Sequence, residues 1–244
     1  FGPQISASIK GNLISGVLDS NTLTTPIDFS GNNSDFSTDP FDSGSTNANL
    51  PIISRFHYDN GATDDIQYDN SSERIIFDNL NPFDYDSGTT GDGYLRLKFF
   101  EDATNGPYTS ADEHQWSPGD ELTISFDWYS VDTSPKTFTI VLLDYAAGQG
   151  DPLTWGVNWV ELTRYDFVSD GIAGTTNSFS HDFYIPTTHT GGLIRAKMFN
   201  GGTSKIGDLG GPSTNDADWI DNFSMTKVSE GFQNPDYYEP TNVI

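Results

Sequence analysis

Four basic side chains stand at alternating positions in two separate segments of the chain. Arg96 and Lys98 form one pair, and Arg195 and Lys197 form the other. Residues two apart in a strand share one face, and each pair faces away from the apolar row of its own segment. If the segments are neighbouring strands, the four cations suit the carboxylates or sulfates of an acidic glycan, to which arginine offers bidentate hydrogen bonds. The alternative is ordinary charge on a solvated sheet face.

Exposed aromatic rings are a second kind of candidate, because the C–H faces of sugars stack on indole and phenol rings. Trp155 stands in a segment flanked by glycine and proline, which indicates a loop. Tyr165 follows it, and Tyr129 falls on the polar side of an alternating segment. We therefore predict that Trp155, Tyr129 and Tyr165 bind glycan together with the four cations. Trp116, just before a Pro-Gly turn, is a further candidate.

Three aspartates near the end of the chain are candidate metal ligands. Strict alternation would place Asp221 on one row with the apolar side chains of Trp219, Phe223 and Met225. A carboxylate on a core-facing row is costly unless it is paired, hydrogen-bonded or bound to a metal. Asp221, with Asp218 and Asp216 nearby, is therefore the predicted metal site. The alternative is that backbone amides or an arginine satisfy Asp221.

The sequence holds none of the common catalytic motifs. It lacks a Gly-x-Ser-x-Gly elbow, a phosphate-binding loop and a His-Glu-x-x-His pair. Its histidines stand far apart, without metal-ligand spacing, at His57, His114, His181 and His189. It has no cysteine, which excludes disulfides, thiolate metal sites and a cysteine nucleophile. We expect a protein that is not an enzyme.

The charge balance limits the partners. The chain carries 35 acidic and 11 basic residues, a formal net charge of −24. Such a field repels phosphates and anionic membrane surfaces, so we expect no nucleic-acid partner. The acidity fits either solubility in salty water or carboxylates that hold divalent cations such as calcium. No segment approaches the roughly 20 apolar residues that span a bilayer, so we expect no membrane insertion.

The elements that must position these residues are strands. Aromatic residues make up 14% of the 244, which favours a packed sheet over disorder. In residues 121–131, Leu122, Ile124, Phe126 and Trp128 alternate with polar residues. Similar segments, separated by Gly- and Pro-rich turns, predict strands at 73–78, 93–100, 137–144, 157–163, 179–185, 193–199 and 219–227. We expect an all-β, antiparallel, jelly-roll-like sandwich with long polar loops.

The ends of the chain differ in composition from its centre. Residues 1–50 are polar, with edge strands at most, and Asp28 to Asn49 contain little that could be buried. Residues 51–228 form the expected sandwich domain. Residues 229–244, with two prolines and several aromatics, form an extended tail that packs on its own domain or docks on a neighbouring subunit. The chain starts at Phe1, as expected of a processed extracellular, cell-surface or virion-surface protein.

Three motifs in order resemble the carbohydrate-binding modules of the family 4/9/16/22-like jelly-roll group. They are Gly93-Tyr94-Leu95-Arg96-Leu97, the Ser117-Pro118-Gly119 turn leading into Ser125-Phe126, and Trp219-Ile220-Asp221-Asn222-Phe223-Ser224. The resemblance covers residues 90–228 and implies a jelly-roll sandwich that binds a polysaccharide or glycoconjugate. It also implies a structural calcium held by the aspartate of the closing strand, Asp221. The N-terminal part departs from the family pattern.

We therefore expect a non-catalytic glycan-binding module. The alternative is a structural protein, such as a virion decoration, fibre or surface-layer subunit, whose terminal arms dock on neighbours or on further copies of itself. Both hypotheses use the same sandwich, because a fold of this kind serves many functions.

Overall fold

A computed structural model describes residues 21–30, 33–41, 52–57, 66–77, 93–100, 112–145, 160–189, 191–202 and 217–230. All named secondary-structure elements in these ranges are β-strands, as predicted. No described segment is a helix long and apolar enough to cross a membrane. The strands are β1 (Asn21–Asp28), β2 (Ile52–His57), β3 (Ile66–Asp69), β4 (Arg74–Phe77), β5 (Gly93–Lys98), β6 (Glu121–Ser130), β7 (Thr137–Tyr145), β8 (Val160–Val168), β9 (Thr175–Tyr184), β10 (Leu193–Asn200) and β11 (Asp218–Glu230).

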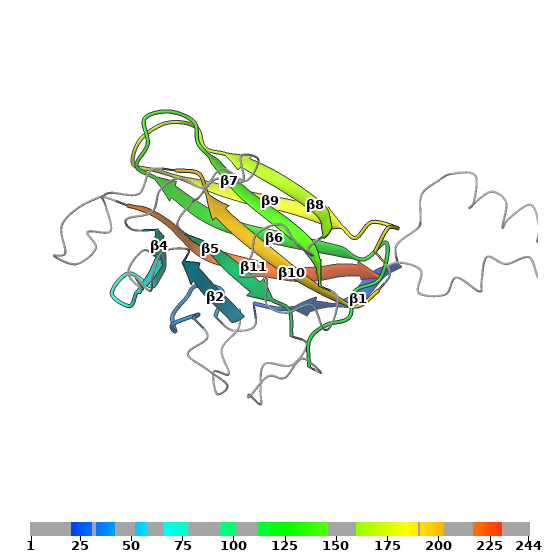
Figure 1. The fold of residues 1–244 in the computed structure, drawn as a ribbon. Helices are drawn as coiled ribbons and strands as arrows, with labels where there is room; N and C mark the ends of the chain where they lie inside the picture. The colour runs from blue at the N-terminus through cyan, green and yellow to red at the C-terminus, as the bar shows by residue number, and fades with distance from the viewer. Residues whose placement is uncertain are drawn as a thin grey trace, which may run out of the picture.

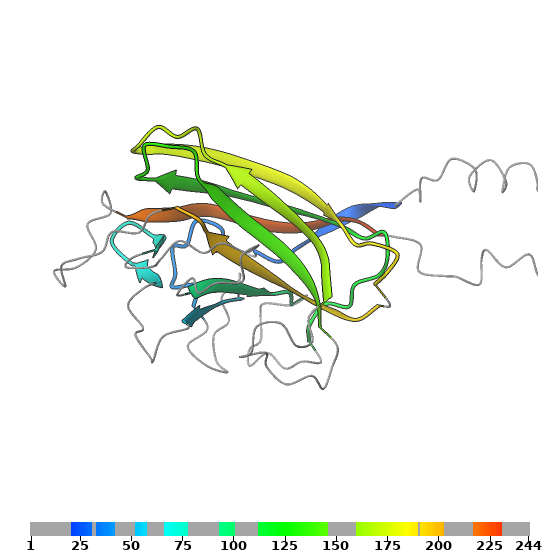
Figure 2. The ribbon, with the colours of Figure 1, turned by 45° about the horizontal axis from the view of Figure 1, so that its top comes forward.

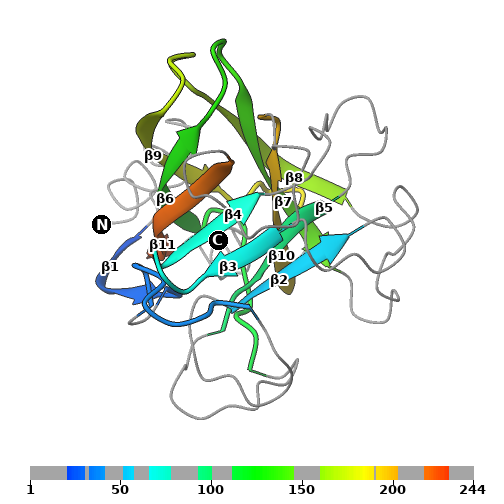
Figure 3. The ribbon, with the colours of Figure 1, turned by 90° about the vertical axis from the view of Figure 1, so that its left-hand side faces the viewer.

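The strands form two antiparallel sheets that pack face to face (Figures 1 and 2). One sheet has the order β3-β4-β11-β6-β9, with β1 pairing with β11. The other has the order β2-β5-β10-β7-β8. Figure 3 shows β1 beside β11, so the chain enters and leaves the described sandwich on neighbouring strands. The predicted antiparallel β-sandwich is confirmed.

Alternating apolar rows make the core between the sheets. Leu122, Ile124, Phe126 and Trp128 of β6 are buried while their neighbours along the strand are half-buried. The facing sheet contributes Leu95 and Leu97 from β5 and a row from β10. Rings meet at Phe126 and Phe138, with centroids 5.0 Å apart. Each fully buried side chain of this size stabilises the fold by about 1.5–3 kcal/mol.

The prediction that residues 28–49 offer little to bury is wrong for the described part of that segment. Phe29 and Phe36 are fully buried, and Phe41 is 7% exposed. Phe29 packs edge-on against Phe99 with ring centroids 5.4 Å apart. These phenylalanines are separated by polar residues in turn conformation, so no alternation marks them in the sequence. β1, which lies within the predicted polar arm of residues 1–50, also pairs with β11 and so belongs to the six-stranded sheet.

A β-bulge in β11 overturns the predicted row of Trp219, Asp221, Phe223 and Met225. The pairing of β11 with β6 shifts register between Asp221 and Ser224, and Asn222 has a φ of 49°. Ile220 faces the core before the bulge, whereas Phe223 and Met225 face it afterwards. Asp221 therefore lies on the outer face, because one extra residue reverses the alternation.

Strand boundaries differ from the sequence prediction at β8, which continues to Val168 beyond the predicted end at 163, and at β9, which begins at Thr175 rather than at 179. Residues 157–159 of the predicted strand 157–163 lie outside the described residues. β2 and β3 were not predicted, because the apolar residues Ile52, Ile53 and Phe56 of β2 do not alternate and the four residues of β3 follow no longer apolar pattern. The possible edge strands before residue 21 and most of the tail 229–244 lie outside the described residues.

Candidate functional site

The basic cluster is defined as Arg96, Lys98, Arg195 and Lys197, on the outer face of the five-stranded sheet. β5 and β10 are antiparallel neighbours, with Arg195 opposite Lys98 and Lys197 opposite Arg96. The core rows of both strands, such as Leu95 and Leu97 on β5, point the other way. The fold therefore gathers four of the eleven basic residues of the chain on two adjacent strands.

Arg195 is held in place by Glu113, from the segment between β5 and β6. Arg195 Nη2 donates to Glu113 Oε2 at 2.9 Å, and Arg195 Nη1 contacts Glu113 Oε1, so the two side chains form a bidentate ion pair. Both side chains are buried. Burial, with a smaller effect of the neighbouring Arg96, lowers the pKa of Arg195 to about 10. The guanidinium is still protonated at neutral pH, and its orientation is set by the two contacts.

Lys197 lies over the ring of Tyr94, with its Nζ 4.3 Å from the ring centroid. Tyr94 also packs against Phe199, with centroids 5.3 Å apart. Lys197 is 3% exposed and Arg195 is 8% exposed, whereas Arg96 and Lys98 are half-buried. The cluster is thus not ordinary charge on a solvated face. Arg96 and Lys98 are its accessible members.

The two predicted aromatic residues that the structure describes, Tyr129 and Tyr165, do not join this cluster. Tyr129 lies on β6 in the other sheet, where its ring stacks on Trp219 at 5.0 Å with an interplanar angle of 4°. Arg74 covers the Trp219 ring at 3.9 Å. This Arg74–Trp219–Tyr129 stack crosses three adjacent strands of the six-stranded sheet.

Tyr165 lies on β8, at the edge of the five-stranded sheet, and is 41% exposed. Its ring stacks on His181 of β9 at 3.6 Å. Trp155 lies outside the described residues. Trp116 is 1% exposed and belongs to the core, so its selection as a further exposed candidate is wrong.

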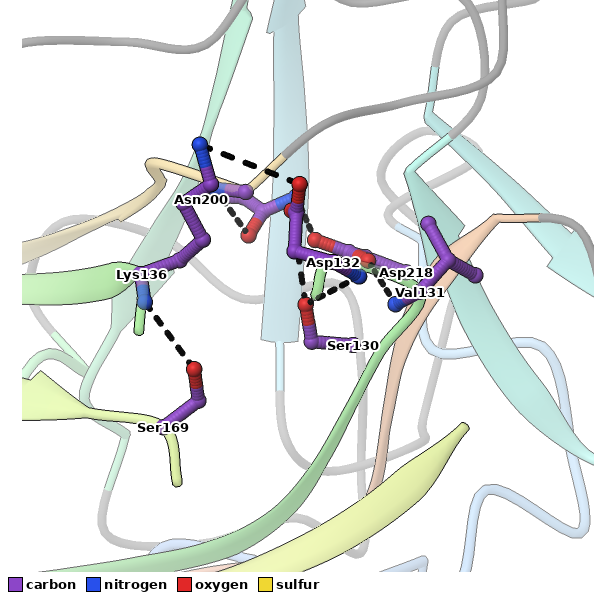
Figure 4. Close-up of polar contacts among 8 residues, drawn as sticks. Ser130, Val131, Asp132, Lys136, Ser169, Asn200 and Asp218 are labelled. Atoms are coloured by element: carbon purple, nitrogen blue, oxygen red, sulfur yellow. Dashed lines mark hydrogen bonds and ion pairs between the residues drawn. The ribbon is translucent and has the colours of Figure 1, made fainter. Parts of the chain in front are cut away.

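Asp218 is a buried carboxylate at the start of β11 (Figure 4). Its Oδ1 accepts from the Val131 N–H at 2.9 Å, and its Oδ2 accepts from Asn200 Nδ2 at 3.1 Å. Gly202 lies so close that a Cβ there would collide with the Asp218 carboxylate. Burial raises the pKa of Asp218 to about 7; the Val131 and Asn200 bonds oppose the rise, and Asp132 adds to it.

Asp221 forms no common site with Asp218. Since 218 and 221 are an odd number of positions apart, before the bulge, they face opposite sides of β11. Asp221 lies 3.8 Å from Arg74 Nε, and the N–H of Asn222 donates to its Oδ1 at 2.7 Å. These are the arginine and backbone-amide partners of the alternative interpretation. Burial raises the pKa of Asp221, while the Asn222 bond and Arg74 lower it.

The described carboxylates and histidines contain no group of three or more that could hold a metal ion. Asp218 and Asp221 do not fit a single calcium site, because each has its own protein partners. Asp216 lies outside the described residues. Calcium binding stays a prediction from the sequence.

Sequence reasoning missed a buried polar cluster under the start of β6. Lys227 is 1% exposed, and its Nζ lies 3.0 Å from Asp120 Oδ2 and 3.2 Å from His114 Nε2. Asp120 in turn accepts from the Ser117 N–H at 2.8 Å. The sequence does indicate that Lys227 is buried, because it stands two positions after Met225 and so continues the core-facing row of Phe223 and Met225. Its partners were not visible, because they lie more than a hundred residues earlier in the chain.

No family model and no curated protein matches the chain. Among solved structures, it is similar to a family 4 carbohydrate-binding module at 12% identity, over 86% of this chain and 99% of the module, with a TM-score of 0.33. It is similar to the C-terminal family 6 module of LamC, a marine laminarinase from Zobellia galactanivorans, at 9% identity, over 72% and 98%, with a TM-score of 0.31.

It is also similar to the enzymatically active domain of tailspike protein 4 of bacteriophage CBA120. That match has 15% identity over 82% of this chain and 21% of the tailspike chain, with a TM-score of 0.34.

Proposed function

We propose that the chain is a non-catalytic glycan-binding module and that it recognises an acidic saccharide at the basic cluster. The observation that supports this most is the register of β5 and β10, which places Lys197 opposite Arg96 and Arg195 opposite Lys98. Four cations on adjacent strands are unusual on a chain with a net charge of −24. Local groups, and not the overall field, must therefore attract an anionic ligand.

The roles of the four residues follow from their burial. Arg96 and Lys98 are half-buried and can donate to a carboxylate or sulfate on the ligand. Arg195 is oriented by Glu113, and Lys197 rests on Tyr94, so both hold their positions from within the protein. In this proposal Arg195 shapes the site, because Glu113 balances its charge, and Lys197 raises the positive potential of the site.

The test is titration calorimetry of the chain with uronic-acid and sulfated oligosaccharides, and with neutral oligosaccharides of equal length. We expect Arg96→Gln and Lys98→Gln each to weaken binding of the acidic ligand by about 10- to 150-fold, since a hydrogen bond to a charged group contributes about 1.5–3 kcal/mol. Lys136→Gln removes the same charge from the turn between β6 and β7 and is the matched control. Equal loss in all three variants would show a charge effect without a site and would refute the proposal.

We further propose that the protein acts outside the cytoplasm, at a cell or particle surface, which fits its acidity. Two expectations concern residues outside the described ranges: stacking of a sugar on Trp155 and docking of the tail 229–244 on a neighbouring subunit. Trp155→Ala and truncation after Glu230 test them separately. Loss of affinity is expected from the first and loss of assembly from the second.

A further inference from the structure

The large apolar side chains that are exposed in the described chain all belong to one pair of neighbouring strands and the turn between them. These five residues lie on β8, on β9 or in the turn between them: Val160, Tyr165, Val168, Ile172 and Tyr184, which are 41% to 62% exposed. Single exposed apolar residues are common on any protein, but a concentration of them marks an interaction surface.

The same region contains one edge of each sheet, as far as the described strands go. β8 ends the five-stranded sheet and β9 ends the six-stranded sheet, and the two strands lie side by side (Figure 1). An edge strand presents backbone N–H and C=O groups to a possible partner strand, and proteins commonly protect such edges with proline, with charged side chains or with a bulge. β8 has the sequence VELTRYDFV, which contains no proline or lysine, and its charged residues Glu161, Arg164 and Asp166 carry both signs. The one bulge in its pairing with β7 lies near its start, between Glu161 and Thr163.

The charges of β8 select a register for pairing with a second copy of the same strand. In an antiparallel pair related by a two-fold axis through the sheet, residues of equal parity face each other. An axis at Arg164 or at Asp166 would place like charges directly opposite, which is destabilising. An axis at Tyr165 places Arg164 of each copy opposite Asp166 of the other, so two oppositely charged pairs form.

We propose that two copies of this chain associate edge to edge along β8, antiparallel and centred on Tyr165. The pairing would join the two five-stranded sheets into one and would bring the exposed Val168 of each copy towards Leu162 of the other. Tyr165 keeps its stacking on His181 of β9, which holds the ring at the edge. Asp166 is held by Thr139, whose Oγ1 donates to Asp166 Oδ1 at 2.7 Å. This proposal is independent of the glycan site, which lies on β5 and β10.

Cross-linking tests the register directly, because the chain has no cysteine of its own. Tyr165→Cys places its thiol next to that of the second copy, where opposite Cα atoms are about 4.5–5.5 Å apart. Val160→Cys is the matched control, since Val160 is also exposed but would lie about 33 Å from its counterpart, ten residues along the strand. We expect mild oxidation or a short bismaleimide to link Tyr165→Cys into a covalent dimer and to leave Val160→Cys without a cross-link. Linkage of both variants to the same extent, or of neither, overturns the register.

Sedimentation velocity of charge-swapped variants tests the pairing without new thiols. Arg164→Asp and Asp166→Arg should each raise the dimer dissociation constant about tenfold, because both symmetry-related pairs become repulsive. The double variant R164D/D166R should restore the dimer, because the pairs are attractive again with reversed sign. Circular dichroism melts show that each variant is folded. A wild-type monomer at concentrations up to about 1 mM, or a dimer that no variant changes, refutes the proposal.

Discussion

Asp218 makes the stability of this protein fall as the pH rises through the weakly acidic range. Its carboxylate is buried, and its pKa in the folded protein is raised from 3.8 to about 7, mainly by burial. Below pH 3.8 the carboxyl is protonated in both states and folding carries no penalty. Between pH 3.8 and about 7 the folded state keeps a proton that the unfolded state has lost, so stability declines; above pH 7 it levels off.

The size of this effect follows from the shift. The difference between 3.8 and about 7 corresponds to about 4 kcal/mol, at about 1.4 kcal/mol per pKa unit. Other groups titrate in the same range with the opposite sign. Burial lowers the pKa of His181, for example, so its contribution rises with pH. The difference in unfolding free energy between the wild type and a variant of Asp218 cancels the contributions of these other groups, because both proteins contain them.

The informative variant is Asp218→Asn, which cannot ionise. Its Oδ1 can still accept from the Val131 N–H, but its Nδ2 would face the Nδ2 of Asn200, which costs about 1–3 kcal/mol at every pH. We expect the variant to be less stable than the wild type at pH 4 and more stable at pH 8.

Urea unfolding, followed by tryptophan fluorescence at half-unit steps from pH 4 to 8, measures the difference. Because the pKa of Asp218 is raised by folding, we expect the free energy of unfolding of the wild type, minus that of the variant, to fall by about 4 kcal/mol as the pH rises from about 4 to about 8. A difference that stays constant with pH would show that Asp218 is ionised in the folded protein and would refute the reasoning.

Three further substitutions test the packing. Phe29→Ala should destabilise the protein by about 3–5 kcal/mol in urea unfolding, because Phe29 is fully buried against Phe99; a loss under 1 kcal/mol would place it outside the core. Lys227→Met should cost about 3–5 kcal/mol, since it leaves Asp120 buried without its cation, and adding Asp120→Asn should recover part of that loss in a double-mutant cycle. Asn222→Ala should be less stable than Asn222→Gly by about 1 kcal/mol in thermal melts, because only the alanine is strained at a φ of 49°; equal stability would argue against the bulge.

Local pattern was enough to predict the central strands β6 and β5. In β6 the apolar residues alternate without interruption, and the same holds for Leu95, Leu97 and Phe99 around β5. The closing strand shows where this reasoning fails. A bulge adds one residue at Asn222, and its effect on which face Asp221 occupies depends on pairing with β6, which no local pattern records.

The site shows the same division. Arg96 and Lys98 stand at alternate positions of one strand, as Arg195 and Lys197 do of another, so the sequence predicted that each pair lies on the outer face of its strand. The structure shows that the two strands are neighbours. That the second pair is buried, with Glu113 against Arg195, was not predictable, because burial depends on segments that the fold brings together. The positions of Tyr129 and Tyr165 on other strands of the sandwich could not be predicted either, because they depend on the order of the strands in the two sheets.

By itself, the sequence determined the class of fold, the core rows of the central strands and the acidic character of the surface, because these follow from residue type and a period of two. Tertiary structure alone decided strand order, the burial of Phe29 and Phe36, the pairing of Lys227 with Asp120 and the environment that raises the pKa of Asp218. The physical reason is that burial and charge pairing depend on distances between residues far apart in the chain, and these distances exist only after the sheets have packed.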